Sequence, residues 1–332
     1  MKSSFDNSVT PAPLSVSVVI PAYNAAAYLA EAIKSVKKQT VAVSEIIVVN
    51  DGSTDDTEKI AERMGATVIS QNNKGLAAAR NIGIRNSKSD WVALLDADDV
   101  WTPTKIERQL QGIGLCQTAA IVTSDHSDHN EAGEIIRPSY LFDKDSEYPQ
   151  INKYAPSLNI SIIDLIDDSF WRVGNFLSPS TIIFKKELGI AVGLFNEDLK
   201  YVEDVEFFLR LLTKGSLVVV EETLMQYRIH TSNWSRNELG MSLSFLKIVD
   251  MLRATPEKYP KGAYEAWVKD VPDKLRLAGT LSLKNGKSSQ SREFFRQFLD
   301  IKFDSSIVVL FLASYMPMFL VQIIYRIKQR FV

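Results

Sequence analysis

Short apolar runs alternate with amphipathic segments of helical length over the first 125 or so residues. The runs expected to form strands are 15–20, 46–49, 66–69, 91–95 and 119–123, and the segments expected to form helices are 25–38, 54–64, 75–84 and 103–113. In segment 25–38, Leu29, Ile33 and Val36 recur at helical spacing. Such alternation predicts βαβ units, and therefore an α/β fold with a mostly parallel sheet and helices on both faces. Pro21 is expected to end the first strand.

The pattern becomes less regular after residue 125. Asn130-Glu131-Ala132-Gly133 predicts a hairpin turn, and further strands are expected at 178–184, 217–220 and 224–229. Segment 203–212 places its apolar residues on one helical face. From about residue 239 the pattern is helical, which predicts a C-terminal helical extension over 236–332 behind a catalytic domain at 14–235.

Composition and charge limit the classes of protein to which this chain can belong. The 332 residues carry a formal net charge of −2, so no global basic field favours nucleic acid. Cys116 is the only cysteine, which excludes an intramolecular disulfide and fits a reducing compartment. Residues 1–13 are polar and lack the apolar core of a secretory signal, so a disordered lead-in and a cytoplasmic location are expected.

Two carboxylates follow the apolar run 91–95. Asp96 and Asp98 are two residues apart, so on an extended chain both can aim at one point beyond the carboxyl end of the strand. Ligands of open α/β sheets bind at that edge. Hard oxygen ligands without a nearby cysteine suit Mg²⁺ or Mn²⁺, ions that usually accompany a phosphate-bearing substrate. The alternative is a solvated acidic turn, and Asp99 is expected to be structural.

Two further loops carry groups suited to a nucleoside. After the first strand, Pro21 is followed by Tyr23, which can stack on a base, and by Asn24, which can hydrogen-bond a ring edge. After the second strand, Asp51 can accept a hydrogen bond from a pyrimidine N–H. Residues 53–55 are expected to cap the following helix instead.

A fourth loop precedes the helix predicted from residue 75. Lys74 and Gly75 stand where the helix N-terminus favours an anion, and Arg80 approaches the same pocket unless it belongs to a solvated helix face. The four loops fall at consecutive crossovers and therefore converge on one edge of the sheet. Together they predict a site for a nucleoside diphosphate with a divalent cation.

The motifs in these loops resemble those of family 2 glycosyltransferases, which have the GT-A fold. The resemblance is carried by segments 18–24 (VVIPAYN), 47–55 (IVVNDGSTD), 75–81 (GLAAARN) and 94–99 (LLDADD), and it resumes at 178–180, 193–197, 201–211 and 227–230. The resemblance implies a Rossmann-like sheet and an inverting enzyme. The enzyme would also be non-processive, because the Gln-x-x-Arg-Trp motif of processive synthases is missing from this sequence.

The resemblance also implies roles for individual residues. Asp204 matches the catalytic base, with Glu203 as second choice. Asp98 would bind the Mn²⁺ or Mg²⁺ ion together with His230, which could instead be an ordinary loop residue. Asp204 could alternatively only cap its helix. The donor pocket would be formed by Pro21, Tyr23, Asn24, Asp51, Lys74, Gly75, Arg80 and Asp96, with Asp51 on the uracil and Asp96 on the ribose or sugar.

The expected reaction is transfer of one sugar from a nucleotide-diphosphate sugar, the UDP form first, to a hydroxyl of a glycan or lipid-linked acceptor. The setting would be cell-surface polysaccharide or glycolipid biosynthesis. Two alternatives stay open. A sugar-phosphate nucleotidyltransferase would carry a Gly-rich, Arg-containing loop after the first strand, where this chain has Pro21-Ala22-Tyr23-Asn24. A non-catalytic sugar-nucleotide-binding module would not need Asp96, Asp98 and Asp204.

An apolar run at 307–324 is followed by Arg326, Lys328 and Arg330. The run is marginal in length for a membrane span, and a span would place the basic residues outside the cell. We expect peripheral or monotopic association with the cytosolic face of the membrane, kinked near Pro317, where the basic residues meet anionic headgroups. The alternative is a soluble helix packed on protein.

Overall fold

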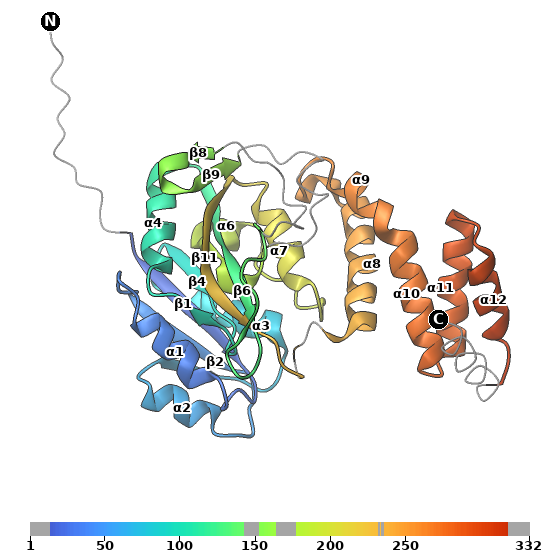
Figure 1. Ribbon diagram of the computed structural model, residues 1–332, viewed down its shortest axis with the longest axis horizontal. Coiled ribbons are helices and arrows are strands. Elements are labelled where there is room, and N and C mark those ends of the chain that lie inside the picture. Colours follow the sequence, from blue (N-terminus) through green and yellow to red (C-terminus); the bar gives the residue numbers. More distant parts are fainter. Residues whose placement is uncertain (1–13, 143–152, 164–176, 232, 234–235, 318–332) are drawn as a thin grey trace, which may run out of the picture.

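In the computed structural model, a mixed sheet covered by helices on both faces is followed by a row of C-terminal helices (Figure 1). The structure describes residues 14–142, 153–163, 177–231, 233 and 236–317. The expected lead-in at 1–13 and the basic residues beyond 317 lie outside this part of the chain. The α/β architecture with a helical C-terminal extension is the predicted fold class, and it is confirmed.

The strands are β1 (Val16–Ala22), β2 (Glu45–Asn50), β3 (Thr67–Ser70), β4 (Trp91–Leu94), β5 (Val100–Trp101), β6 (Ala119–His129), β7 (Ile135–Arg137), β8 (Lys153–Ala155), β9 (Ile160–Ile163), β10 (Ile183–Lys185) and β11 (Ser216–Arg228). The α-helices are α1 (Leu29–Lys37), α2 (Thr57–Arg63), α3 (Leu76–Asn86), α4 (Lys105–Leu115), α6 (Lys186–Ala191), α7 (Glu203–Leu211), α8 (Glu238–Ala254), α9 (Ala263–Trp267), α10 (Val271–Lys284), α11 (Ser288–Ile301) and α12 (Ser305–Ala313). Short 3₁₀ turns stand at Pro156–Leu158, Pro179–Thr181, Pro256–Lys258 and Val268–Asp270.

The main path of the sheet runs β3-β2-β1-β4-β10-β6-β11-β9-β8. Strands β1 to β4 are parallel, whereas β10 is antiparallel to both of its neighbours, β4 and β6. The carboxyl ends of β1, β2 and β4 therefore lie at one edge, as the βαβ pattern predicted. Pro21 does not end β1, because the strand pairs with β2 as far as Ala22↔Asn50.

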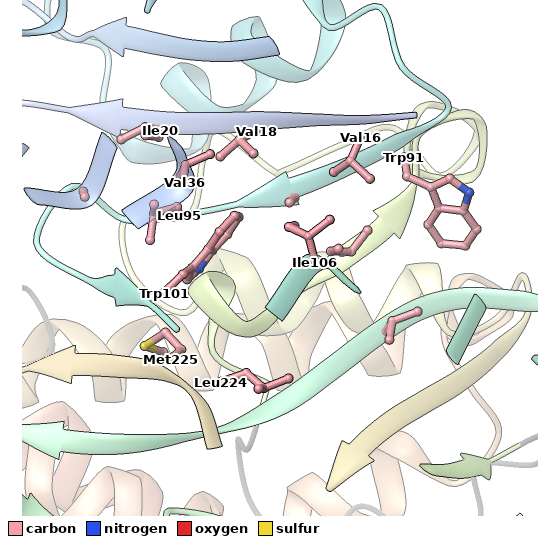
Figure 2. Close-up of a cluster of buried hydrophobic side chains, with 14 of the residues drawn as sticks. Val16, Val18, Ile20, Val36, Trp91, Leu95, Trp101, Ile106, Leu224 and Met225 are labelled. Carbon is pink, nitrogen blue, oxygen red and sulfur yellow. The ribbon is translucent and has the colours of Figure 1, made fainter. Parts of the chain in front are cut away.

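Two apolar layers hold the helices against the sheet. On one face, Val16, Val18 and Ile20 of β1 pack with residues of α1 and α4, including Val36 and Ile106 (Figure 2). On the other face, residues of α3 and α7 form a second buried cluster with the remaining sheet residues. Alternate residues of β1 reach opposite clusters, since Val19 belongs to the second one. Burial on both faces explains the nearly continuous apolar runs of these strands.

Three expected elements differ in the structure. Strand β6 continues to His129, beyond the expected end at residue 123, because Asp125 is buried and its Oδ1 accepts the backbone N–H groups of Tyr140 at 3.0 Å and Leu141 at 2.8 Å. The two strands expected at 217–220 and 224–229 are one strand, β11, with register shifts between Val220 and Met225. Segment 178–184 is not one strand, because Pro179–Thr181 form a 3₁₀ turn and β10 starts only at Ile183.

The C-terminal helices begin directly against the sheet domain. Leu252 and Tyr259 share a buried cluster with Val205 and Leu209 of α7. Helices α10, α11 and α12 continue outward as a second apolar group (Figure 1). Among the residues that the structure describes, no helix combines the length and apolar character needed to cross a bilayer.

Candidate active site

A cavity of about 450 Å³ opens at the carboxyl edge of the parallel strands. Eight of the twelve predicted site residues line it, namely Pro21, Tyr23, Asn24, Asp51, Gly75, Asp96, Asp98 and His230. The other lining residues are Ala22, Ala25, Tyr28, Asn73, Leu76, Ala79 and Ala97. Lys74, Arg80, Glu203 and Asp204 do not line this cavity. Five segments that are far apart in the sequence thus meet in one concave space, as in most ligand sites.

Asp51 organises one end of the cavity. It is buried, its Oδ1 accepts hydrogen bonds from Gln71 Nε2 at 2.6 Å and from the backbone N–H of Lys74 at 2.8 Å, and its Oδ2 accepts from Gly75 N–H at 2.9 Å. Lys74 contributes through its backbone, and Gly75 has φ +93° just before α3. Asp51 therefore fixes the loop that precedes α3, while its carboxylate still borders the cavity.

The neighbouring loop is held by polar side chains that were expected to cap α2. Ser53 Oγ accepts from Asn24 N–H at 2.9 Å, and Asn24 Oδ1 accepts from Thr54 N–H at 2.8 Å. Asp55 accepts from Ala26 N–H at 3.1 Å and from Thr57 N–H at 3.0 Å. The cap position itself is Asp56, whose side chain makes no capping bond. Residues 53–55 thus mainly connect two loops of the cavity wall.

Asp98 and His230 meet at the other end of the cavity. His230 Nε2 lies 2.9 Å from Asp98 Oδ2, and the ring of His230 stacks on Tyr28 with centroids 5.0 Å apart. Burial, reinforced by the charge of Asp96, raises the pKa of Asp98 above its ordinary value. A carboxylate and an imidazole facing one cavity are donors that a divalent cation accepts.

Asp99 holds the acidic loop from behind. It is buried, its Oδ2 accepts from Ser180 Oγ at 2.6 Å, and its Oδ1 accepts from the backbone N–H of Arg228 at 3.2 Å. Ser180 Oγ in turn accepts from Asp96 N–H at 3.0 Å. Arg228 Nε also donates to the backbone carbonyl of Asp98 at 3.1 Å. These contacts agree with the structural role expected for Asp99, which is to hold the acidic loop in place.

Arg80 lies behind the cavity, with its side chain only 1% exposed. Its Nη2 donates to Asp96 Oδ1 at 2.7 Å, and its Nη1 donates to Glu203 Oε1 at 2.8 Å. The solvated helix face that was the alternative for Arg80 is wrong, because the side chain is enclosed between two carboxylates. Burial opposes the charged guanidinium, but Asp96 and Glu203 together hold the pKa of Arg80 above its usual value.

Glu203 and Asp204 form the first turn of α7. Burial raises the pKa of Glu203 to about 7; the charge of Asp204 acts in the same direction, while Arg80 opposes it. Burial also raises the pKa of Asp204, although Arg80 and the backbone N–H of Val205 oppose the shift. At this helix N-terminus, desolvation therefore outweighs the dipole that would lower a carboxyl pKa. Asp204 is not the cap residue, because α7 already starts at Glu203.

The donor set suits a cation that is completed by a substrate. No cluster of three or more His, Cys, Asp or Glu side chains able to hold a metal occurs within the described ranges. Mg²⁺ characteristically binds one or two carboxylates together with substrate phosphates instead of a cage built only of protein. Asp98 with His230 fits that pattern, because the two side chains offer one carboxylate and one imidazole to a single cavity.

Tyr28 is a residue that the sequence reasoning missed. Its ring lines the cavity, stacks on His230, and lies 5.3 Å from the guanidinium carbon of Arg228. The sequence pattern assigned Tyr28 to the helix expected at 25–38, whereas α1 starts only at Leu29, so Tyr28 stands in the turn before it. Ala22, Ala25 and Ala97 were also missed, because small apolar residues carry no chemical signal of a site.

Comparison with known proteins agrees with this geometry. Residues 17–163 match the family described as Glycosyl transferase family 2. An uncharacterized glycosyltransferase of Rickettsia typhi is 34% identical over 235 residues, which are 69% of this chain and 69% of the relative.

Solved structures show the same fold at lower identity. Residues 1–349 of S. aureus TarS in complex with UDP-GlcNAc align with a TM-score of 0.61 and 18% identity, covering 90% of this chain and 84% of that one. The mannosyltransferase PcManGT from Pyrobaculum calidifontis, in complex with GDP-Man and Mn²⁺, aligns with a TM-score of 0.55 and 16% identity, covering 96% and 86%. The fold is that of GT-A glycosyltransferases, and the chain belongs to glycosyltransferase family 2.

Proposed function

We propose that this glycosyltransferase transfers a single sugar from a nucleotide-diphosphate sugar, the UDP form first, to a hydroxyl group with inversion of the anomeric centre. The observation that carries the proposal is the common cavity bordered by Asp51 at one end and by Asp98 with His230 at the other. A nucleoside placed against Asp51 would extend its diphosphate toward that pair. The UDP-GlcNAc complex of TarS, a protein of the same fold, supports this choice of donor.

In this proposal Pro21, Tyr23 and Asn24 form the wall of the nucleoside pocket. Asp51 accepts the N–H of the uracil, and Asp96 contacts the ribose or sugar. Lys74 and Gly75 shape the pocket through their backbone, which Asp51 holds. Arg80 serves the pocket through Asp96.

Asp98 and His230 would hold Mn²⁺ or Mg²⁺. When bound there, the cation would neutralise charge that develops on the departing nucleoside diphosphate. The Mn²⁺ and GDP-Man complex of PcManGT supports a metal at such an edge in this fold.

Asp204 is the proposed general base, and Glu203 is the second choice. The acceptor hydroxyl attacks C1 of the sugar from the face opposite the diphosphate and gives its proton to the Asp204 carboxylate. A carboxyl pKa raised by burial makes Asp204 a better proton acceptor than an exposed carboxylate would be. We place the acceptor side in segment 125–180, of which residues 143–152 and 164–176 lie outside the described part of the chain. A glycan or lipid-linked acceptor of cell-surface polysaccharide or glycolipid synthesis would bind there.

The test combines a ligand screen with two substitutions. Nucleotide sugars are screened in Mn²⁺ for an increase in melting temperature, because a ligand that binds only the folded state stabilises it. Hydrolysis of the best donor is then measured for the wild type and for Asp98→Ala and Asp204→Asn. Loss of turnover in both variants is expected, and unchanged turnover in both would refute the mechanism.

The C-terminal helices supply a second proposal, binding to the cytosolic face of a membrane. Around α12, Phe303 is 81% exposed, Val309 58% and Leu312 60%, although all are apolar. Exposed apolar groups near a basic segment are typical of interfacial membrane binding. We expect the protein to co-sediment with vesicles that contain anionic lipid, and we expect Val309→Ser with Leu312→Ser to reduce this. Val41→Ser, at an exposed position of the sheet domain, is the matched control. Equal sedimentation of all variants would contradict the proposal.

A further inference from the structure

Helix α3 connects the donor cavity to the carboxylates of α7. Its start is fixed at Gly75 by Asp51, and Ala79 on the same helix lines the cavity. The next two residues, Arg80 and Asn81, are both 1% exposed. Asn81 bonds the segment that leads into α7, and Arg80 bonds both Glu203 of α7 and Asp96 of the cavity lining. One helix therefore contacts both halves of the proposed active site.

The guanidinium of Arg80 bonds two carboxylates that belong to different parts of the site. Asp96 lines the donor cavity, whereas Glu203 stands beside the proposed base and 123 positions away from Arg80 in the sequence. The planar fork of an arginine can address both acceptors from fixed positions, which the single ammonium of a lysine cannot do. Arg80 Nε is buried without a hydrogen-bond partner among the described residues, so the hydrogen bonds of the guanidinium are those to Asp96 and Glu203, and its carbon also lies 5.4 Å from the ring centroid of Phe195.

The chain between Phe195 and Glu203 is held in register by α3 as well. Asn81 Oδ1 accepts from Phe195 N–H at 2.9 Å, and Asn81 Nδ2 donates to Phe195 O at 2.9 Å and to Glu197 Oε1 at 2.8 Å. Just before α7, Val202 adopts φ +60° and ψ +19°. A β-branched residue rarely adopts this left-handed conformation, and such strain persists only where surrounding contacts impose it.

We propose that Arg80 is a positioning residue, which holds the Glu203-Asp204 turn at a fixed distance from Asp96 and so aims the base at the donor sugar. This inference rests on the proposed function, because it assumes that Asp204 takes the proton. Arg80 itself touches neither donor nor acceptor. Its contribution is to the geometry of the reacting groups, where small displacements change the rate strongly.

The test compares Arg80→Lys with Arg210→Lys. Arg210 is a matched control, because it is also buried and also pairs with a glutamate, Glu206 at 2.6 Å, on α7. It also donates to the backbone carbonyl of Leu194 at 2.6 Å, but it contacts neither Asp96 nor Glu203. Turnover, donor KM, the Kd for UDP in Mn²⁺ and the melting temperature are measured for both variants.

Arg80→Lys is expected to lower kcat by roughly 100-fold while the Kd for UDP stays within about threefold of the wild-type value. Arg210→Lys is expected to lower the melting temperature and to leave kcat within about threefold at a temperature well below the transition. Unchanged kcat in Arg80→Lys, or a rise in Kd or KM with kcat unchanged, would overturn the positioning role.

A double-mutant cycle with Glu203→Gln keeps the inference testable if Arg80→Lys is poorly folded at high temperature, since all four proteins can be compared in the cold. Because the two residues act through one contact, the effects on kcat should be less than multiplicative. Fully multiplicative effects would overturn the inference. If the wild type neither hydrolyses nor transfers from any nucleotide sugar, the proposed function fails and this inference fails with it. Changes confined to UDP affinity would refute only the role of Arg80.

Discussion

His230 Nε2 lies 2.9 Å from Asp98 Oδ2, although 132 positions separate the two residues in the sequence. Strand β11 makes this possible, because it ends at Arg228 beside the acidic loop, and Arg228 donates to the backbone of Asp98 and to the side chain of Asp99. The stacked ring of Tyr28 fixes the other side of the imidazole. The proposed metal ligands are thus oriented by neighbours before any ion binds.

Replacing either proposed metal ligand should weaken Mn²⁺ binding and so reduce the metal-dependent hydrolysis of the donor. We expect His230→Ala to raise the Mn²⁺ concentration for half-maximal donor hydrolysis by about 10- to 100-fold, and Asp98→Asn to reduce activity further. Removing divalent cations with a chelator should abolish wild-type activity, and adding Mn²⁺ should restore it. Asp250→Asn, at an exposed position of α8, is the control. Identical Mn²⁺ titrations for wild type and His230→Ala would exclude this histidine as a ligand.

Asp51 should determine nucleotide affinity. Asp51→Ala leaves the Gln71 amide and the backbone N–H groups of Lys74 and Gly75 without their acceptor, and losing a buried partner costs about 1–3 kcal/mol. We expect the Kd for UDP, measured by calorimetry, to rise roughly 5- to 150-fold. Gln71→Ala removes only one of the three donors and should have a smaller effect. An unchanged Kd in Asp51→Ala would place the nucleoside elsewhere.

Much of the site could be predicted from the sequence because parallel strands share one carboxyl edge. Once the apolar runs that end before Asp51 and Asp96 are assigned to parallel strands, their acidic residues must lie close together. The structure places both in the lining of one cavity. The role predicted for His230 came from the family resemblance and not from the alternation of strands and helices. A single histidine after a strand does not indicate which residues it will face.

The remaining contacts depend on packing that a local pattern does not encode. The sequence left two places for Arg80, the donor pocket or a solvated helix face, and the structure shows neither, because the buried side chain pairs with Glu203, 123 positions later, behind the cavity. Strand β6 was predicted too short because residues 123–129 are polar. These residues are nevertheless buried except for His129, since β11 pairs along them and Asp125 bonds the returning chain. Long-range partners therefore decide both cases.

Glu203 should make stability depend on pH. The ordinary pKa of this carboxyl is 4.5, and burial raises it to about 7 in the folded state. Between these values the folded protein holds a proton that the unfolded chain has released, so the free energy of unfolding falls as pH rises. The loss attributable to Glu203 is on the order of 3 kcal/mol.

In the variant Glu203→Gln the side chain is an amide, which stays neutral at every pH and takes up no proton in this range. We therefore expect its free energy of unfolding, measured in denaturant from pH 4.5 to 7, to fall less steeply with pH than that of the wild type. Glu265→Gln, at an exposed position of α9, should keep the wild-type slope. Parallel slopes for the wild type and Glu203→Gln would mean that Arg80 keeps this carboxylate charged throughout the range.

The C-terminal helices should stabilise α7 through one buried hydrogen bond. Tyr259 Oη donates to Glu206 Oε1 at 2.8 Å, and both side chains are buried. Tyr259→Phe removes this bond to a charged acceptor, which is worth about 1.5–3 kcal/mol, so we expect a melting temperature several degrees lower. Tyr264→Phe is the control, since Tyr264 packs against the same cluster but its hydroxyl makes no hydrogen bond within the part of the chain described. Turnover well below the transition should stay within about twofold, because Tyr259 lies outside the site. An unshifted melting temperature would show that the extension does not support α7 through this contact.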